Sequence, residues 1–524
     1  MFDILIKNGT IVDGTGRKSY RADAGIEKDK IVKIGKLEGS RTRREIDAGG
    51  KIVSPGFIDI HNHSDSYWRI FLEPSLPSLV YQGITTVIGG NCGASIAPLT
   101  DGRIIESIQK WVDMRHVNVD WLSMAEFGEK MSTRKFAVNF GTLVGHGTLR
   151  RGLVLDEMRR LDKSELKVLV RLLDQAMQSG ALGLSSGLAY SHERKAGWDE
   201  ILELAETVKY QGKVYATHLK NESHNLIFAL EEAIDIAKDS GVSLEISHLK
   251  AAGKENWGLM DQALEMIDKA REESVDINFD VYPYTLTASV LYFFLPDWAV
   301  EGGKQMMLKR LKAESLRAKI IQDMRRKAEY DYGEAIVASS SVSKTLAGRT
   351  LAEIAKGQES TVEEAIINLL LASEGRVLII SDCLSEENVR KALKHSLSIV
   401  ASDGAGYGDT YGKNGELVHP RSFGTFPRVL GKYVREEKAL ELEEAVRKMT
   451  SLPARKCNIE NRGILAKNYQ ADIVIFDQDK ICDKATAENP FQYAEGVSEV
   501  IVNGKLALSE GKLTEELAGA FITA

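Results

Sequence analysis

The sequence predicts an α/β fold, a (β/α)8 TIM-like barrel joined to a small β-sandwich domain that is built from both termini. Through the middle of the chain, short apolar runs alternate with amphipathic segments, which is the pattern of parallel strands connected by helices. Residues 1–54 and 456–524 instead alternate polar and apolar residues between turns, as antiparallel strands do. The length of 524 residues suits a barrel with a second domain.

Eight barrel strands are expected between residues 55 and 455. They are, in order, 57–61, 84–90, 136–146, 181–186, 213–218, 243–248, 276–282 and 398–403. Segments 164–180, 198–212 and 259–274 repeat apolar residues every three or four positions and predict helices between strands. An open doubly wound sheet has the same periodicity, so it stays open as an alternative.

Two segments do not fit this alternation. The apolar run 376–381 is a ninth strand candidate, which we place as an accessory strand before the eighth. Residues from about 287 to 350, rich in Lys, Arg and Met, are too many for a short connection between a strand and a helix. We expect this insert to be a lid or a binding loop.

Composition restricts the classes of partner and of compartment. The net charge of −7 lacks the basic footprint of a nucleic-acid-binding protein. The four cysteines share no CxxC spacing, which favours a reduced, cytoplasmic protein. A signal-peptide pattern and a run of 18 apolar residues are both absent from the sequence, so neither export nor a membrane partner is expected.

Most of the expected strands end in a residue that can bind a metal. In a barrel these ends meet at one face, where active sites lie. A lone His, Cys or Asp more often has a structural role, but unrelated structural causes would not place six such residues at strand ends. The set suits Zn²⁺, which accepts nitrogen, sulfur and carboxylate ligands. Its members are His61, His63, Cys92, His218, His248 and Asp403.

Several motifs resemble the N-acyl-D-amino-acid deacylase (D-aminoacylase) family of the amidohydrolase superfamily. The resemblance covers essentially the whole chain. HxH after the first strand is shared by many amidohydrolases, whereas the motif NCG, the motif SHLK and the long motif near residue 420 are more specific. The matching segments include PGFIDIHNHSD, GITTVIGGNCGAS, ATHLKNES, ISHLKAAGKENWG, ASDG and HPRSFGTFPRVL.

The resemblance implies a role for each predicted ligand. It assigns one tightly bound zinc to Cys92, His218 and His248, and a second, weaker site to His61, His63 and Asp403. Most related hydrolases bridge two metals with a carbamylated Lys, and here Cys92 takes that place. Asp403 is also the expected general base and acid: it accepts a proton from zinc-activated water and passes it to the leaving nitrogen. The expected reaction removes the acyl group from an N-acyl-D-amino acid.

A small-molecule substrate of this class carries an α-carboxylate, which calls for a cation near the metal. Lys250 lies two residues beyond His248 and so on the same side of an extended chain. We expect it to anchor the carboxylate, with Tyr190 and Tyr282 as hydrogen-bonding partners, a choice that the resemblance supports.

The chain departs from the family at one place. After GLAY the family usually continues with a Pro-Gly turn, whereas this chain reads SHERKA at 191–196. Family members often self-associate, which makes a homo-oligomer a further expectation. Two other functions stay open: a cyclic-amide or dipeptide hydrolase, like dihydroorotase or isoaspartyl dipeptidase, and a scaffold protein without a metal. The cyclic-amide and dipeptide hydrolases usually carry a bridging Lys, which Cys92 replaces here. A scaffold protein would lack metal ligands, whereas this sequence has all the expected ones.

Overall fold

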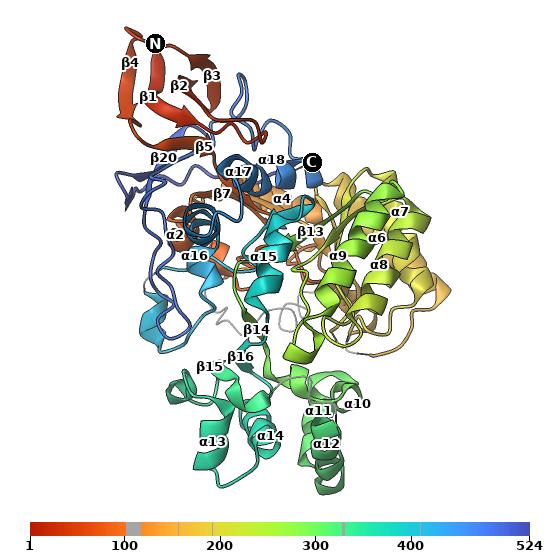
Figure 1. Ribbon diagram of the computed structural model, residues 1–524. Helices are drawn as coiled ribbons and strands as arrows, with labels where there is room; N and C mark the ends of the chain where they lie inside the picture. Colours follow the sequence, from red (N-terminus) through yellow and green to blue (C-terminus); the bar gives the residue numbers. More distant parts are fainter. Residues whose placement is uncertain (101–116, 156, 191, 327–330, 409, 524) are drawn as a thin grey trace.

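The computed structural model describes residues 1–100, 117–155, 157–190, 192–326, 331–408 and 410–523. Figure 1 shows three parts in a row, with a β domain at one end, a barrel in the middle and the insert at the other end. The N-terminal strands and the C-terminal strands lie together in the β domain, as the alternating pattern at both termini predicts.

All eight predicted barrel strands are present and parallel. β8 and β9 are two pieces of one strand. The strands are β6 (Phe57–Asp59), β7 (Ile84–Gly89), β8 (Asn139–Thr142) with β9 (Val144–Gly145), β10 (Gly183–Gly187), β11 (Val214–His218), β12 (Ser243–Ile246), β13 (Ile277–Val281) and β17 (Ser398–Val400).

The sheet closes between its first and last strands. One row of paired strands runs in the order β17-β13-β12-β11-β10-β9, and a second row runs in the order β6-β7-β8. The seam is made just beyond β6 and β17, where Asn62 and Gly404 form a parallel bridge. There the amide of Asp403 donates to the carbonyl of His61 at 2.9 Å, and the amide of His63 donates to that of Gly404 at 2.7 Å. The fold is therefore a closed barrel and not an open doubly wound sheet.

Some barrel helices begin at a side-chain cap that the sequence supplies, whereas others begin without one. At the start of α6 (Lys163–Gln178), Asp162 and Glu165 exchange hydrogen bonds in a capping box. No helix in the described ranges is both long and apolar enough to cross a membrane. The other helices of this part are α1 (Arg69–Leu72), α2 (Pro77–Val80), α4 (Met124–Thr133), α5 (His146–Val154), α7 (Trp198–Tyr210), α8 (Leu226–Ser240), α9 (Leu259–Glu272), α15 (Glu386–Lys394), α16 (Arg421–Arg428), the π-helix Val429–Glu436, α17 (Leu442–Met449) and α18 (Ser451–Lys456), with 3-10 turns at Lys254–Asn256 and Tyr411–Asn414.

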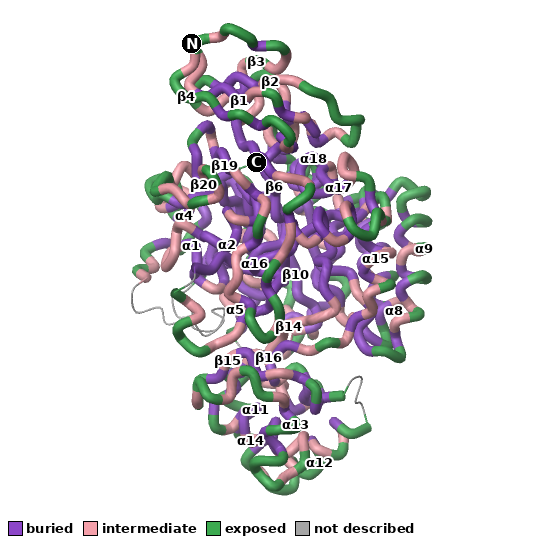
Figure 2. Tube along the Cα trace, turned by 60° about the vertical axis from the view of Figure 1, so that its left-hand side comes forward, coloured by how far each residue is buried: buried purple, intermediate pink, exposed green. Residues whose placement is uncertain are grey.

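The barrel interior is packed and not an open channel. Inward side chains such as Ile58, Ile88 and Leu182 form one buried cluster, and Leu452 of α18 joins it. Figure 2 shows buried chain running through the middle of the molecule. A filled interior leaves only the ends of the barrel for binding, so the strand ends are the place to look for chemistry.

The β-sandwich has its own core, made largely of Ile side chains from both termini. Its nine strands pair in the order β21-β20-β19-β18-β5-β1-β2-β3, with β4 beside β1. The strands are β1 (Phe2–Ile11), β2 (Tyr20–Glu27), β3 (Lys30–Gly35), β4 (Thr42–Asp47), β5 (Ile52–Pro55), β18 (Ile473–Phe476), β19 (Val497–Val502), β20 (Lys505–Ser509) and β21 (Lys512–Leu513).

The insert is longer than the predicted 287–350. The apolar run 376–381 belongs to β16, the central strand of the insert's own sheet, which pairs antiparallel with β14 and β15. The insert therefore ends near Asp382, and it encloses a separate hydrophobic core. Its elements are β14 (Leu286–Val290), α10 (Asp297–Val300), α11 (Gly303–Lys312), α12 (Glu314–Arg326), β15 (Ile336–Ser340), α13 (Leu351–Gly357), α14 (Val362–Ala372) and β16 (Val377–Asp382), with 3-10 turns at Leu291–Phe294, Tyr332–Glu334 and Lys344–Leu346.

The closure of the barrel depends on a buried carboxylate. Asp59 Oδ1 accepts the amide of Ser402 at 2.8 Å, and its Oδ2 accepts the Ser402 hydroxyl at 2.5 Å and the Asn62 amide at 2.8 Å. Asp59→Ala leaves these donors buried and unpaired, so we expect the free energy of unfolding to fall by about 2–4 kcal/mol. Urea unfolding followed by circular dichroism measures this. As control, Asp47→Ala removes an exposed carboxylate bonded to Asn8, and an equal shift for both variants would contradict the assignment.

Candidate metal centre and active site

The barrel seam brings the first three predicted ligands together. His61 and His63 follow β6, and Asp403 follows β17. Nε2 of His63 lies 3.0 Å from Oδ1 of Asp403, and Nε2 of His61 lies 3.5 Å from the same oxygen. All three side chains are buried, and their ligand atoms lie close enough to hold one cation.

Cys92 enters the site from the turn after β7. Its backbone is left-handed, with φ of 53°, as are those of His248 at 36° and Asp403 at 48°. For residues other than glycine this conformation costs roughly 1 kcal/mol or more. Three such positions within one cluster indicate that side-chain placement at this site outweighs backbone preference.

Cys92, His218 and His248 form a second set of donors. Sγ of Cys92 lies 3.8 Å from Nδ1 of His218 and 3.4 Å from Nε2 of His248, and the two nitrogens are 2.9 Å apart. Tetrahedral zinc with N and S ligands at ~2.0–2.3 Å separates its donors by ~3.3–3.6 Å. The three residues therefore match zinc in donor type. The separation of Cys92 from His248 lies in that range, whereas His218 is slightly too far from Cys92 and too close to His248. Sγ of Cys92 also lies 3.3 Å from Nε2 of His61, between the two sets.

Two carboxylates orient the imidazoles from behind. Asp280 Oδ2 lies 3.0 Å from Nδ1 of His61, and Glu222 Oε1 lies 2.9 Å from Nδ1 of His248. Each fixes the ring so that Nε2 faces the cluster, the usual arrangement around a metal-binding histidine. Glu222 also groups with His218 and His248 through their other ring nitrogens.

Sequence reasoning missed both carboxylates, although a signal was present for each. Asp280 is a charged residue within the otherwise uncharged strand β13. Glu222 follows His218 by four residues. A carboxylate close to a predicted histidine ligand in sequence, or buried on a neighbouring strand, is a candidate for the residue that orients the ring.

The electrostatics favour ionised ligands. Burial opposes ionisation of Cys92, but His61 and His248 outweigh it and hold the pKa of the thiol well below its usual value. Burial likewise opposes ionisation of Asp403, while Arg421 and His61 bring the pKa of its carboxyl well below its usual range. A thiolate is the form that binds zinc, and a carboxylate is the form that accepts a proton.

The three predicted substrate-binding residues lie beside this cluster. The Tyr190 ring is 5.0 Å from that of His218. The Tyr282 hydroxyl is buried without a hydrogen-bond partner in the described part of the chain. Lys250 is less free than expected, because its Nζ donates to Glu222 at 2.5 Å and to the carbonyl of His248 at 2.9 Å.

Arg421 is a cation that sequence reasoning did not single out, although it lies in the motif HPRSFGTFPRVL. Its Nη1 pairs with Oδ2 of Asp403 at 2.8 Å, and its guanidinium lies over the Tyr282 ring at 4.8 Å. Its Nε is buried and lacks a hydrogen-bond partner among the described residues. Arg421 and Tyr282 therefore offer two unused donors side by side.

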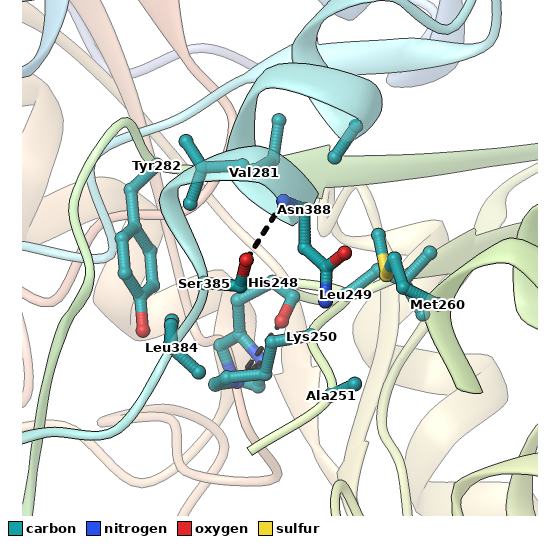
Figure 3. A pocket seen from close by; sticks show the side chains of 12 residues that line it. His248, Leu249, Lys250, Ala251, Met260, Val281, Tyr282, Leu384, Ser385 and Asn388 are labelled. Atoms are coloured by element: carbon teal, nitrogen blue, oxygen red, sulfur yellow. Dashed lines mark hydrogen bonds between the residues drawn. The ribbon is translucent and has the colours of Figure 1, made fainter. Parts of the chain in front are cut away.

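A cavity adjoins this end of the barrel (Figure 3). Its lining includes His248, Lys250 and Tyr282 together with the apolar side chains Met260, Leu384 and Val389. Leu384 follows the insert directly, and Val389 lies on α15. The charged centre of the site therefore lies next to a cavity with apolar lining, close to where the insert rejoins the barrel.

Known proteins share both the sequence and the architecture. A model of the amidohydrolase family matches residues 44–507. The chain is 34% identical to the N-acyl-D-glutamate deacylase of Alcaligenes xylosoxydans xylosoxydans, over 96% of this chain and 93% of that one. It is 32% identical to the D-aminoacylase of the same organism, over 99% and 97%.

A solved structure extends the likeness to three dimensions. The N-acyl-D-glutamate deacylase from Bordetella bronchiseptica, complexed with zinc and a phosphonate inhibitor, matches with a TM-score of 0.84 and 29% identity, over 100% of both chains. The resemblance drawn from the motifs is confirmed. The chain belongs to the amidohydrolase family.

Proposed function

We propose that this protein is a zinc-dependent hydrolase that removes the acyl group from N-acyl-D-amino acids, giving a D-amino acid and a carboxylate. The observation that carries the proposal is the buried cluster of Cys92, His218 and His248 beside Asp403, whose carboxylate pairs with Arg421 at 2.8 Å. The names of the relatives, N-acyl-D-glutamate deacylase and D-aminoacylase, support the substrate class.

Cys92, His218 and His248 would hold the zinc, and His61, His63 and Asp403 would form a second, weaker site. When bound, zinc polarises the amide carbonyl, stabilises the negative charge that develops on its oxygen and lowers the pKa of a water toward ~7. A buried site strengthens each of these effects, because it keeps bulk water away.

Asp403 moves the proton. Its Oδ2 is engaged by Arg421, whereas its Oδ1 faces His61 and His63. Oδ1 is therefore the oxygen on the side of the proposed ligands, and we assign to it the proton from the attacking water. The same oxygen then gives this proton to the amide nitrogen as the C–N bond breaks, which lets the amine leave as a neutral group. The pair with Arg421 keeps Asp403 charged at the start of each cycle and fixes its orientation.

Arg421 joins Lys250, Tyr190 and Tyr282 in the proposed binding of the substrate's α-carboxylate. Burial keeps the pKa of both phenols well above the usual value, so each hydroxyl donates. Lys250 is shared with Glu222. The unpartnered donors of Arg421 and Tyr282 are therefore the stronger attraction for an anion, since buried donors gain most from a charged acceptor.

The alternative is a cyclic-amide or dipeptide hydrolase of the same superfamily. The free buried donors favour a substrate with an open carboxylate, and Cys92 stands where those enzymes usually carry a bridging Lys. A cytoplasmic location and self-association stay predictions.

A substrate panel tests the function. We expect about one zinc per chain and release of free amine from N-acetyl-D-amino acids at least about tenfold faster than from the L-isomers. Holding the carbonyl and the carboxylate at two fixed points leaves one enantiomer with a misplaced side chain. Zinc without release from either series would refute the proposal, and a cyclic amide and a β-aspartyl dipeptide in the same panel would then identify the alternative.

Two variants should lose turnover for different reasons. Cys92→Ala should lose zinc to below about a tenth per chain, because a ligand is gone. Asp403→Ala should keep about one zinc per chain, yet its kcat should fall by about 10²–10⁴, because proton transfer is gone. Metal analysis and kinetics are measured on the same samples. Cys457→Ala, at the buried floor of the barrel, is the control that should keep zinc; normal zinc in Cys92→Ala would contradict the ligand assignment.

Tyr282→Phe removes a single buried hydroxyl and keeps the ring over which Arg421 stacks. We expect kcat/KM to fall about tenfold for an N-acetyl-D-amino acid, the loss of one hydrogen bond to a charged group. The matching N-acetyl amine, which has no carboxylate, should be hydrolysed at the rate of the unaltered enzyme, and an equal loss on both compounds would assign the hydroxyl another role.

A further inference from the structure

The turn after β10 is the place where this chain departs from its family's motif, and it holds a fully buried carboxylate. Of the segment 191–196, Ser191 lies outside the described residues. Glu193 has no exposed surface, although its neighbours in sequence, Arg194 and Lys195, reach solvent. Burying a charge is costly unless it is paired, so the partners of Glu193 show what the turn does.

Glu193 is held by a buried charge network. Its Oε2 lies 2.8 Å from Nδ1 of His146, whose Nε2 lies 2.7 Å from Oε1 of Glu200. Burial opposes the charge on His146, but these two carboxylates outweigh it and raise the pKa of the imidazole to about 9. In turn, burial opposes the charge on Glu193, but His146 lowers the pKa of the carboxyl to about 2. His146 and Glu193 are therefore a permanent ion pair at neutral pH.

The inner side of Glu193 touches the backbone that carries Cys92. A Cβ on Gly93 would lie 2.0 Å from Oε1 of Glu193, so the carboxylate packs directly against this glycine. Oε2 also accepts the amide of Gly187 at 2.7 Å. A Cβ on Gly187 would lie 2.4 Å from the carbonyl oxygen of Cys92. Glu193 thus supports the Cys92 turn at two adjacent points.

The same contacts place Tyr190. Its amide donates to the carbonyl of Gly187 at 2.9 Å, and its carbonyl accepts the amides of Glu193 and Arg194, both at 3.0 Å. These backbone bonds tie Tyr190 to Gly187 and to Glu193, and the Glu193 carboxylate completes the connection by accepting the Gly187 amide. The position of the Tyr190 ring beside His218 depends on that connection.

The outer side of the turn faces the insert. Arg194 pairs with Asp297 of α10, and Lys195 lies 3.6 Å from Glu301. The amide of Gly302 donates to Sδ of Met158, in the nearby segment before α6, at 3.0 Å. The insert begins shortly after Tyr282, so contacts that fix α10 also restrain the chain leading from the site.

We propose that the turn 192–195 is a positioning element, in which Glu193 holds Tyr190 and the Cys92 turn from behind while Arg194 and Lys195 hold the insert beside the same site. Neither side contacts the reacting atoms. The expected effect on catalysis rests on the proposed function. The contacts by which the turn holds the Cys92 backbone and the insert do not depend on it.

The inner side is tested with Glu193→Gln, which keeps the size of the side chain and removes its charge. Measured on zinc-loaded enzyme with an N-acetyl-D-amino acid, KM should rise about tenfold and kcat should change less than threefold. In the background of Tyr190→Phe, Glu193→Gln should alter KM less than about twofold, because the effects of substitutions at two residues that act together do not add. Zinc affinity, measured by chelator competition, should fall about tenfold.

The outer side is tested with Lys195→Ala, on an exposed side chain, and with Arg194→Ala, on a partly exposed side chain that also donates to the carbonyl of Ala189 at 2.7 Å. Amide exchange of a peptide spanning 286–302 should become at least threefold faster in each, and the difference should shrink in high salt, since exposed pairs are screened. Arg325→Ala is the matched control: it breaks a pair with Glu363 inside the insert and should leave this peptide unchanged. Asp297→Arg combined with Arg194→Glu should restore slow exchange.

Three results would overturn the proposal. One is an equal effect of Glu193→Gln in both backgrounds, which would mark a general loss of stability. The second is unchanged zinc affinity in Glu193→Gln, and the third is unchanged exchange in the Arg194 and Lys195 variants. Zinc affinity and amide exchange are measured without substrate, so they test this proposal even if the enzyme hydrolyses a different amide. Inactivity toward every N-acyl-D-amino acid would count against the proposed function alone.

Discussion

The closure of the barrel between its first and last strands is the constraint on which the candidate site depends. The hydrogen bonds that join Asp403 to His61 and His63 to Gly404 are the same ones that complete the ring of strands. Closure brings together residues that lie more than 340 positions apart in the chain. If this seam were open, the two histidines and the carboxylate would lie at opposite edges of a sheet.

A second constraint is the balance of charge in a space that excludes water. The thiol, the imidazoles and Asp403 are all buried, and desolvation alone would drive each toward its neutral form. Each charge that the chemistry needs has an opposite one beside it, with Arg421 for Asp403 and Glu222 for Lys250. Asp280 serves His61 in the same way. These supporting pairs set the protonation states and orient the rings, so the ligands and their partners act as one unit.

The insert and the turn after β10 show how one family scaffold can vary. The insert is a folded unit with its own sheet and core, attached to the barrel through the segments that follow β13 and precede α15. The turn carries a buried ion pair facing inward and two ion pairs with the insert facing outward. A turn fixed by Pro-Gly is held by its own backbone, whereas this one is held by His146 and by the insert. Its geometry therefore depends on residues from three separate parts of the chain.

The sequence by itself determined the architecture and which residues gather at one end of the barrel. Strand and helix periodicity is local, and ligand residues at strand ends converge in any closed barrel. Hence the eight strands and the six clustered residues were predictable. The roles of Asp280, Glu222 and Arg421, the restraint on Lys250 and the full length of the insert were decided only by the tertiary structure. The physical reason is that a charge partner is defined by distance in space. The uncharged strand around Asp280 marks this residue as unusual, but it does not identify His61, 219 residues away in the chain, as the partner at 3.0 Å.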